Sequence, residues 1–507
     1  MKRLFFIIHL AVFLICTGAI ILGVVLRLVE TVNGNYVFGF DQGLDMIAAR
    51  SIAYDHKLTL IGSEAGAGFA GLPGIFHGPG YHYILAAILI VSFGNPYGAI
   101  VFLCGLSLMV LYALYRLSNG VFGDGSAKAV LILFAISLPL TAQARMIWAP
   151  NFSGLIAVPF LYALWSSRKK TYVSIFLTAF LAASLYHFEI PMAIPALVAV
   201  SIYFLAVLRL SGTRRWMSFA AGVIAGFLPM ILFESRHGWG IARGLFAYGT
   251  RVSGNSQMKP FMPLQELFGD GNAMVSTMRE SFAFGIPWIT QMFPFLLLIA
   301  TCWYVYGEKK KELKQFVIGL LLLIGAHLLV YYPYRGPVYS HYFSLLYIVY
   351  PIVAAYTAVR ALHGRYTRWL VFGFGALLLV SVYTKFPKII VYDIADYGGV
   401  AKIRGKIDAI DVIYQDAGDI KFNLMVFTPP VYTYAYDYLL GWYADKKYGY
   451  LPGSQKTGTV YLLIEPDGEK PWSYNGWLET VIKRGDIVAS WKLPSGFIIE
   501  KRLMGEE

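Results

Sequence analysis

The sequence predicts an all-α polytopic membrane bundle of about eleven transmembrane helices, followed by a small soluble α/β domain. Of its 507 residues, 57% are hydrophobic and only 14% are charged, and the mean hydropathy is +0.59. A soluble domain carries about 25% charged residues, so lipid is the expected solvent for most of this chain. Long apolar segments recur up to residue 384, and the composition then becomes more polar. We therefore expect a transmembrane domain, 1–384, and an extracytoplasmic domain, 385–507.

The formal net charge of +13 comes from basic residues that stand in short clusters between the apolar segments. Such clusters are typical of cytoplasmic loops in membrane proteins, so the charge does not indicate nucleic-acid binding. The expected spans are 4–26, 98–117, 128–144, 152–167, 172–186, 190–208, 216–233, 287–305, 316–332, 342–359 and 369–384. With these spans, the clusters around Arg168, Lys310 and Arg365 all lie on the cytoplasmic side. The N-terminus is then cytoplasmic and the C-terminus lies outside, as in a bacterial inner-membrane protein.

Two apolar segments are distinguished by their length. The first, from Leu4 to about Leu26, is longer than the hydrophobic part of a signal peptide and lacks a small-residue cleavage site, so we expect a transmembrane helix. The second, 81–93, has only about a dozen apolar residues and ends at Gly94-Asn95-Pro96. A span needs about 20 residues, so this segment fits an interfacial helix better.

The C-terminal region shows the alternation and turn signals of a mixed α/β domain. The segments 421–428, 459–464, 487–492 and 496–501 are predicted to be strands, and 432–446 is predicted to be a helix.

The first outer region, 27–97, contains the most informative pair of acidic residues. Asp41 and Asp45 are four residues apart, so a helix that begins here places both carboxylates on one face. Arg50 follows on the same segment. A structural interpretation remains open, in which Asp41 caps the helix and Asp45 is a solvated acid in its first turn.

Further polar side chains gather where the expected helices reach the outer side, including the second long outer loop, 234–286. The candidates for substrate contact are Gln42, Asp45, His77, Arg145, Asn151, His187, Glu189, Arg335 and His341. Each also has a simpler explanation, since a loop histidine is often just solvated and an arginine at the end of a span often reaches toward lipid headgroups. The sequence has no phosphate-binding Walker loop, no HExxH and no GxSxG motif.

The segment Asp41-Gln42 followed by Arg50, together with Gly74-Ile75-Phe76-His77-Gly78-Pro79, resembles the GT-C membrane glycosyltransferases. The likeness is to the bacterial branch of protein O-mannosyltransferases and lipid A aminoarabinose transferases, and it covers about residues 1–384. It implies that Asp41 is the catalytic base. Gln42 stands where the family usually has Glu, and His77 stands where the aminoarabinose branch has a phosphate-facing Lys.

The resemblance implies inverting transfer of a sugar from a polyprenyl-phosphate donor to a glycan, lipid or protein acceptor. Asp41 would deprotonate the acceptor hydroxyl, while Arg145, Arg335 or His77 would hold the phosphate. No cofactor is required, and Asn151 stands near the place where several relatives carry a second acid, so a divalent metal is not demanded. The alternatives are a transporter of lipid-linked glycans, which would place charges at mid-membrane, and a non-catalytic assembly factor, which would lack Asp41.

Overall fold

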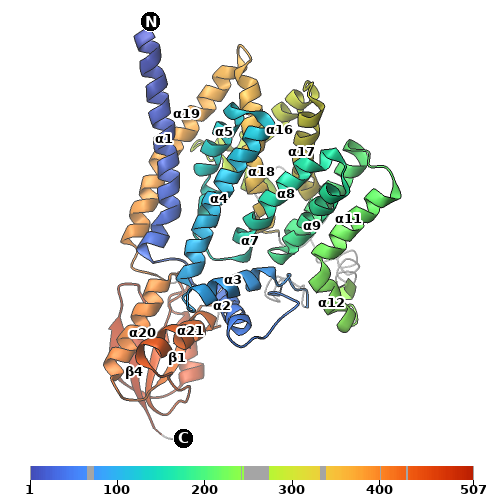
Figure 1. Ribbon diagram of the computed structural model, residues 1–507. Helices are drawn as coiled ribbons and strands as arrows, with labels where there is room; N and C mark the ends of the chain where they lie inside the picture. The colour runs from blue at the N-terminus through green and yellow to red at the C-terminus, as the bar shows by residue number, and fades with distance from the viewer. Residues whose placement is uncertain are drawn as a thin grey trace, which may run out of the picture.

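The computed structural model describes residues 2–64, 74–240, 242–244, 273–331, 338–399, 401–429 and 432–505. A bundle of helices makes up most of the molecule, and a small domain with a β-sheet lies at one end of it (Figure 1). The N-terminus and the C-terminal domain lie at opposite ends of the bundle (Figure 1).

Seven helical segments within the described residues are long and apolar enough to cross a membrane. They are α1 (Lys2–Asn33), α4 (Tyr97–Phe122), α10 (Ile190–Ile202) with η4 (Tyr203–Val207), α16 (Pro287–Tyr306), α17 (Lys311–Tyr331), η5 (Ser340–Phe343) with α18 (Ser344–Leu362), and α19 (Thr367–Ala395). A pair bent by 67°, α11 (Thr213–Gly226) and α12 (Leu228–Arg236), gives an eighth if it is counted as one span. The chain is therefore a multi-pass membrane protein, and the predicted fold class is confirmed.

Even with the bent pair counted, there are eight long spans among the described residues and not the expected eleven, because three of the expected spans are short helices. These are α5 (Asp124–Ala135), α8 (Gly154–Ser166) and α9 (Tyr172–Ser184). Helix α5 ends before α6 (Leu138–Gln143), which has Pro139 in its first turn, where a missing N–H is tolerated. Short 3₁₀ turns, η2 (Ser167–Lys169) and η3 (Leu185–His187), end the other two.

Arg27 corrects the expected start of the first outer loop. Helix α1 continues through this residue to Asn33, and Arg27 is only 1% exposed. Its guanidinium donates to the carbonyl oxygens of Phe134 and Ala135, at 2.8 and 2.6 Å. The last carbonyls of a helix have no partner within the helix, so Arg27 satisfies the end of α5 and is part of the packed bundle.

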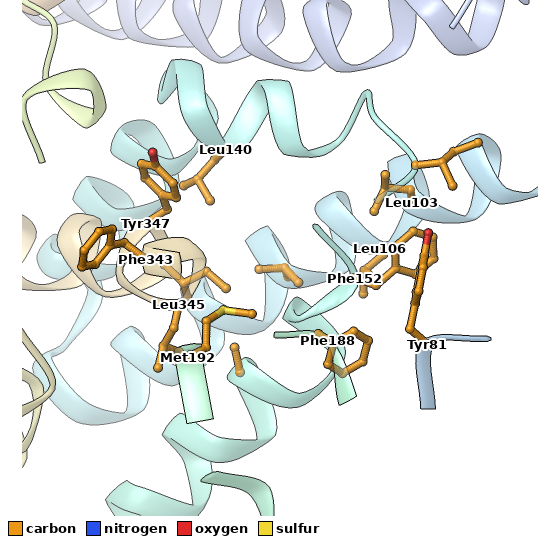
Figure 2. Close-up of a cluster of buried hydrophobic side chains, with 14 of the residues drawn as sticks. Tyr81, Leu103, Leu106, Leu140, Phe152, Phe188, Met192, Phe343, Leu345 and Tyr347 are labelled. Atoms are coloured by element: carbon orange, nitrogen blue, oxygen red, sulfur yellow. The ribbon is translucent and has the colours of Figure 1, made fainter. Parts of the chain in front are cut away.

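Two helices of the first outer region lie at the end of the bundle that is nearer the C-terminal domain. Helix α3 (Gly80–Val91) runs across the ends of α4 and α7 (Ala149–Phe152), beside α2 (Phe40–Ala53) (Figure 1). With 12 residues, α3 has the length of the expected interfacial helix. Figure 2 shows Tyr81 of α3 next to Phe152, within a larger cluster of buried hydrophobic side chains, and the two rings are 5.2 Å apart.

The C-terminal domain contains a four-stranded sheet in the order β1-β2-β4-β3. All four predicted strands are confirmed: β1 (Asn423–Phe427), β2 (Gly458–Ile464), β3 (Asp486–Lys492) and β4 (Ile498–Met504). Strand β1 is parallel to β2, and the other neighbours are antiparallel. The helices are α20 (Ile403–Ala417), which was not predicted, α21 (Tyr434–Leu439), η6 (Leu440–Ala444), α22 (Asp445–Tyr448), α23 (Ser473–Trp477) and η7 (Leu478–Ile482).

The C-terminal domain contacts the bundle through the segment that precedes α2. Val37 forms β-bridges with both Met146 and Lys402. Helix α2, which follows this segment, packs closely against α21. A side chain on Gly43 of α2 would overlap the backbone of Tyr434 and Ala435. Helix α19 also continues past residue 384, where the tail was expected to begin, and ends at Ala395.

Candidate functional site

The start of α2 is fixed by Gly39 and Gln42. Gly39 is the N-cap residue, and its N–H donates to Oε1 of Gln42 at 2.9 Å. The Gln42 amide donates in turn to the carbonyl oxygen of Ile147 at 2.8 Å. Gln42 therefore ties α2 to the loop before α7, and both ends of its side chain are already engaged within the protein. Its contact with substrate remains a prediction.

Asp41 does not cap α2, because Gly39 is the N-cap residue. The structural interpretation of Asp41 as a helix cap is therefore wrong. The Asp41 side chain is half-buried, and within the described residues no hydrogen bond or ion pair holds its carboxylate. Burial, and then the nearby Asp45 carboxylate, raise the pKa of Asp41 to about 6. An unpaired carboxylate with a pKa near neutrality has the properties of a general base.

Asp45 is part of a compact polar cluster that the sequence did not predict. Its Oδ1 atom accepts a hydrogen bond from Oγ of Ser63 at 2.8 Å and lies 3.0 Å from Nε2 of His82. Ser63 Oγ and His82 Nε2 are 3.1 Å apart. The position of His82 immediately after Tyr81, in the first turn of α3, is the signal that could have drawn attention to it.

Tyr81 adds a buried hydroxyl group near the two acids. The residue is only 2% exposed, and its hydroxyl has no hydrogen-bond partner among the described residues. Burial raises the pKa of Tyr81, and the negative charges of Asp45 and Asp41 raise it further. The hydroxyl therefore stays protonated and can donate a hydrogen bond to a bound molecule.

His77 and Glu189 form a second buried pair. The N–H of Ile190 donates to Nδ1 of His77 at 3.2 Å, so the ring hydrogen of the neutral imidazole lies on Nε2. That Nε2 atom is 3.6 Å from Oε1 of Glu189, which is 6% exposed. Burial raises the pKa of Glu189 to about 8 and lowers the pKa of His77 to about 4.

The remaining predicted histidines lie around this pair. His187 accepts a hydrogen bond at Nδ1 from the N–H of Gly80, at 3.2 Å, and so fixes the start of α3. His341 packs its ring against Trp148, with the centroids 4.5 Å apart. Neither residue carries an assigned role beyond these contacts, and their contact with substrate remains a prediction.

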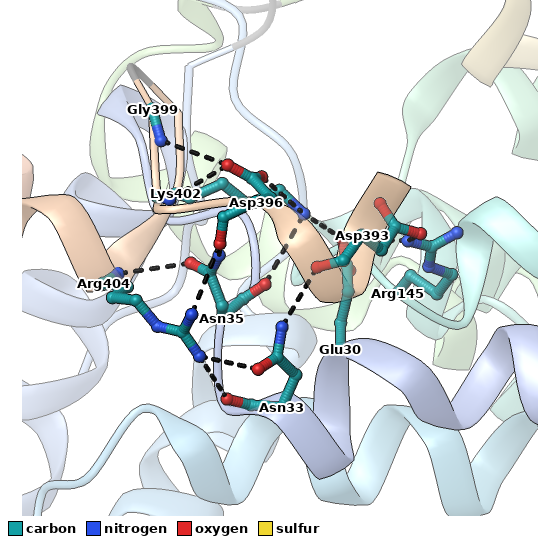
Figure 3. Close-up of polar contacts among 10 residues, drawn as sticks. Glu30, Asn33, Asn35, Arg145, Asp393, Asp396, Gly399, Lys402 and Arg404 are labelled. Atoms are coloured by element: carbon teal, nitrogen blue, oxygen red, sulfur yellow. Dashed lines mark hydrogen bonds and ion pairs between the residues drawn. The ribbon is translucent and has the colours of Figure 1, made fainter. Parts of the chain in front are cut away.

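Arg145 lies in a network of ion pairs (Figure 3), and it also lines a pocket together with Glu280. Its Nη2 atom is 3.1 Å from Oε1 of Glu30 and also pairs with Asp393, and its side chain is 12% exposed. Lys402 pairs with the same Glu30. Two carboxylates therefore already balance the charge of Arg145, which makes it a poor partner for a phosphate.

Asn151 and Arg335 are the other two residues predicted to contact substrate. The Asn151 side chain donates to the carbonyl oxygen of Met146 at 2.8 Å and so closes the loop before α7. Arg335 lies outside the described residues. Within the part of the chain that the structure describes, no group of three or more His, Cys, Asp or Glu side chains is placed to hold a metal ion.

Comparison with known proteins identifies the fold. No protein-family model and no curated protein matches the chain. A crystal structure of ArnT from Cupriavidus metallidurans bound to undecaprenyl phosphate matches with a TM-score of 0.55 at 10% identity, over 97% of each chain. The apo structure of the same protein gives 0.52 at 11% identity, again over 97% of each chain. An Archaeoglobus fulgidus oligosaccharyltransferase complex with Zn and sulfate gives only 0.44 at 13% identity, over 97% of this chain and 73% of that one.

The ArnT structures therefore show the fold of this chain. ArnT is a lipid A aminoarabinose transferase of the GT-C superfamily, so the predicted resemblance is confirmed as a resemblance in fold. At about 10% identity, the likeness assigns no role to individual residues.

Proposed function

We propose that this chain is a membrane glycosyltransferase that transfers a sugar from a polyprenyl-phosphate donor to an acceptor on the outer face of the membrane. The observation that carries the proposal is Asp41, a half-buried carboxylate with no bonding partner among the described residues, at the start of α2. The fold supports it, because a solved structure of ArnT is bound to undecaprenyl phosphate.

In the proposed reaction, Asp41 accepts the proton of the acceptor hydroxyl as that oxygen attacks the anomeric carbon. The new C–O bond forms on the face opposite the phosphate, and the bond from the anomeric carbon to the phosphate oxygen breaks. The polyprenyl phosphate leaves with the bonding electrons, so the configuration at the anomeric carbon inverts. Base catalysis of this type contributes about 10²–10⁴-fold to the rate.

The leaving phosphate needs hydrogen-bond donors, and the structure offers neutral ones. Nε2–H of His77 and the Tyr81 hydroxyl are both available, since neither group makes a hydrogen bond from these atoms within the described residues. Protonated Glu189 is a third donor. We assign the phosphate side to these groups rather than to Arg145, whose charge is balanced by Glu30 and Asp393. Arg335 remains a candidate from the sequence.

The outer face is assigned from the distribution of charge. The basic clusters around Arg168, Lys310 and Arg365 belong to the connections between helices at the end of the bundle away from α2 (Figure 1). The rule that cytoplasmic loops are positively charged supports an orientation with α2, α3 and the C-terminal domain outside.

The substitution Asp41→Asn tests the proposal. Asn keeps the size of Asp41 but cannot accept the proton, so transfer should fall by about 10²-fold or more. The assay follows release of polyprenyl phosphate from a panel of radiolabelled polyprenyl-phosphate sugars, in membranes that contain the expressed chain. Asp55→Asn is the matched control, because Asp55 is an exposed acid just beyond the other end of α2. Normal turnover by well-folded Asp41→Asn protein would refute the assignment of the base.

A further inference from the structure

Asp45 carries the charge that most directly affects Asp41. It lies four residues after Asp41, on the same face of α2. Asp45 is only 5% exposed, and so is His82, which faces it from α3. Ser63, Asp45 and His82 are in mutual contact at 2.8 to 3.1 Å. An ionised carboxylate in such a buried position needs donors, and these two side chains supply them.

We propose that His82 and Ser63 are positioning residues that balance the charge of Asp45 and thereby set how strongly Asp41 holds its proton. This inference rests on the proposed function of Asp41 as the base. It also changes the role expected for Asp45. Instead of contacting the acceptor, the Asp45 carboxylate has its charge balanced by His82 and Ser63 and acts on the neighbouring base.

The geometry excludes a nucleophilic triad for the same three residues. In a triad, the histidine uses one ring nitrogen for the carboxylate and the other for the serine. Here Nε2 of His82 contacts both Asp45 and Ser63, and the Ser63 hydroxyl donates to the carboxylate. Ser63 is therefore a donor to Asp45, and among the described residues no separate base contacts its hydroxyl.

The charge balance matters because no donor from the described part of the chain holds the Asp41 carboxylate. Burial contributes most to its raised pKa, and the Asp45 carboxylate contributes next. Arg50, on the same helix, donates to the carbonyl oxygen of Gly441. Within the described residues, neither Asp41 nor Asp45 forms an ion pair with a lysine or an arginine. The other titratable groups on the elements around the two acids are Tyr81 and Tyr83 of α3, His77 of the segment before it, Glu64 next to Ser63, and Tyr434, Tyr436, Asp437 and Tyr438 of α21.

An infrared titration of Asp41 tests the inference without any substrate. The carboxyl band of protonated Asp41 is isolated as the difference between each variant and the same variant that also carries Asp41→Asn. Asp45→Asn removes the neighbouring charge, so the titration midpoint of Asp41 should fall by about one pH unit. Ser63→Ala removes one donor from Asp45 and should raise the midpoint by a smaller amount. Asp55→Asn is the control and should leave the midpoint unchanged.

His82 is tested by two substitutions. His82→Leu leaves Asp45 without its main partner, so the midpoint of Asp41 should rise. His82→Gln keeps an N–H near the position of Nε2 and should raise the midpoint less. If His82→Leu does not fold, the double variant Asp45→Asn/His82→Leu decides, because with no charge left to balance it should titrate like Asp45→Asn alone.

An unchanged midpoint in Asp45→Asn would overturn the inference. So would a double variant whose midpoint differs from that of Asp45→Asn, since His82 would then act on Asp41 by another route. The experiments distinguish failure of this inference from failure of the proposed role of Asp41 as the base. If Asp41→Asn keeps its transfer activity while the midpoints move as expected, the base assignment is wrong and the charge-balancing cluster stands.

Discussion

Nε2 of His77 lies 3.6 Å from Oε1 of Glu189, and both side chains are neutral at pH 7. Burial produces this result, because it disfavours the charged form of each group and so moves the two pKa values in opposite directions. The pair therefore presents hydrogen-bond donors without a net charge. A phosphate that binds there is attracted by donors and meets no negative charge until Glu189 ionises.

We expect a bell-shaped dependence of kcat/KM on pH. Below pH 6 the rate should fall, because Asp41, with a pKa of about 6, becomes protonated and cannot act as a base. Above pH 8 it should fall again, because Glu189, with a pKa of about 8, becomes an anion that repels the donor phosphate. The measurement is initial-rate kinetics from pH 5 to pH 9.5 with a polyprenyl-phosphate sugar that the chain accepts.

Glu189→Gln separates the two limbs of this profile. Gln keeps a donor at position 189 and never ionises, so the alkaline limb should disappear, while the rate at pH 7 stays within about threefold of the original and the acidic limb is unchanged. An alkaline limb that persists in Glu189→Gln would show that another group causes it.

The fold was predictable from the sequence because its signals are local, whereas the site depends on distant contacts. Hydropathy and alternation gave the bundle and the four strands. Asp41 is a candidate because it stands four residues before Asp45 and because the segment resembles the GT-C glycosyltransferases, whereas Glu189 is a candidate because an acid at the end of a membrane span is costly. The partner of Asp45 is His82, 37 residues away, and nothing local marks that contact. Likewise, the sequence shows Arg145 as a cation at a helix end, but only the folded chain brings Glu30 and Asp393 to it.

We expect Arg145→Ala to lower the stability of the protein more than it weakens the affinity for the donor. It leaves the buried carboxylate of Asp393 without its ion-pair partner and leaves Glu30 with Lys402, and breaking such a buried pair costs about 3 kcal/mol. We expect a lower apparent Tm in detergent, partly recovered in Arg145→Ala/Asp393→Asn. Arg365→Ala is the control, because Arg365 is exposed. A normal Tm combined with a raised KM for the donor would instead support the phosphate contact predicted from the sequence.

Membrane orientation follows from the basic clusters and can be tested with tags. Tags inserted after Lys170 and after Lys311 should be protected in intact cells, whereas a tag at Glu507 should be accessible from outside. Each tag carries one cysteine, and the measurement is the accessibility of that cysteine to an impermeant thiol reagent. Lysed cells are the control for labelling. If the tag at Glu507 were cytoplasmic, the orientation would be the opposite of the one proposed, and Asp41 would lie on the cytoplasmic side, away from the proposed reaction.

The contact between α2 and α21 gives a test of whether the C-terminal domain holds the base in place. A side chain on Gly43 would overlap the backbone of Tyr434 and Ala435, so Gly43→Ala must push the two helices apart. Since Asp41 is two residues away, we expect kcat to fall by about tenfold, because a small displacement of a catalytic group is costly. KM for the donor should change little, since His77 and Glu189 lie outside α2 and α21.

Gly441→Ala is the matched control for this substitution. Gly441 belongs to the same part of the C-terminal domain, but no neighbouring atom would lie within 4 Å of an added Cβ. It should therefore keep both kcat and KM. The steady-state parameters of the two variants, with the apparent Tm of each, make the comparison. If Gly43→Ala folds and keeps its full kcat, the docked domain does not position Asp41. If Gly43→Ala raises the donor KM as much as it lowers kcat, the displacement reaches the phosphate side, and the separation of the two halves of the site is wrong.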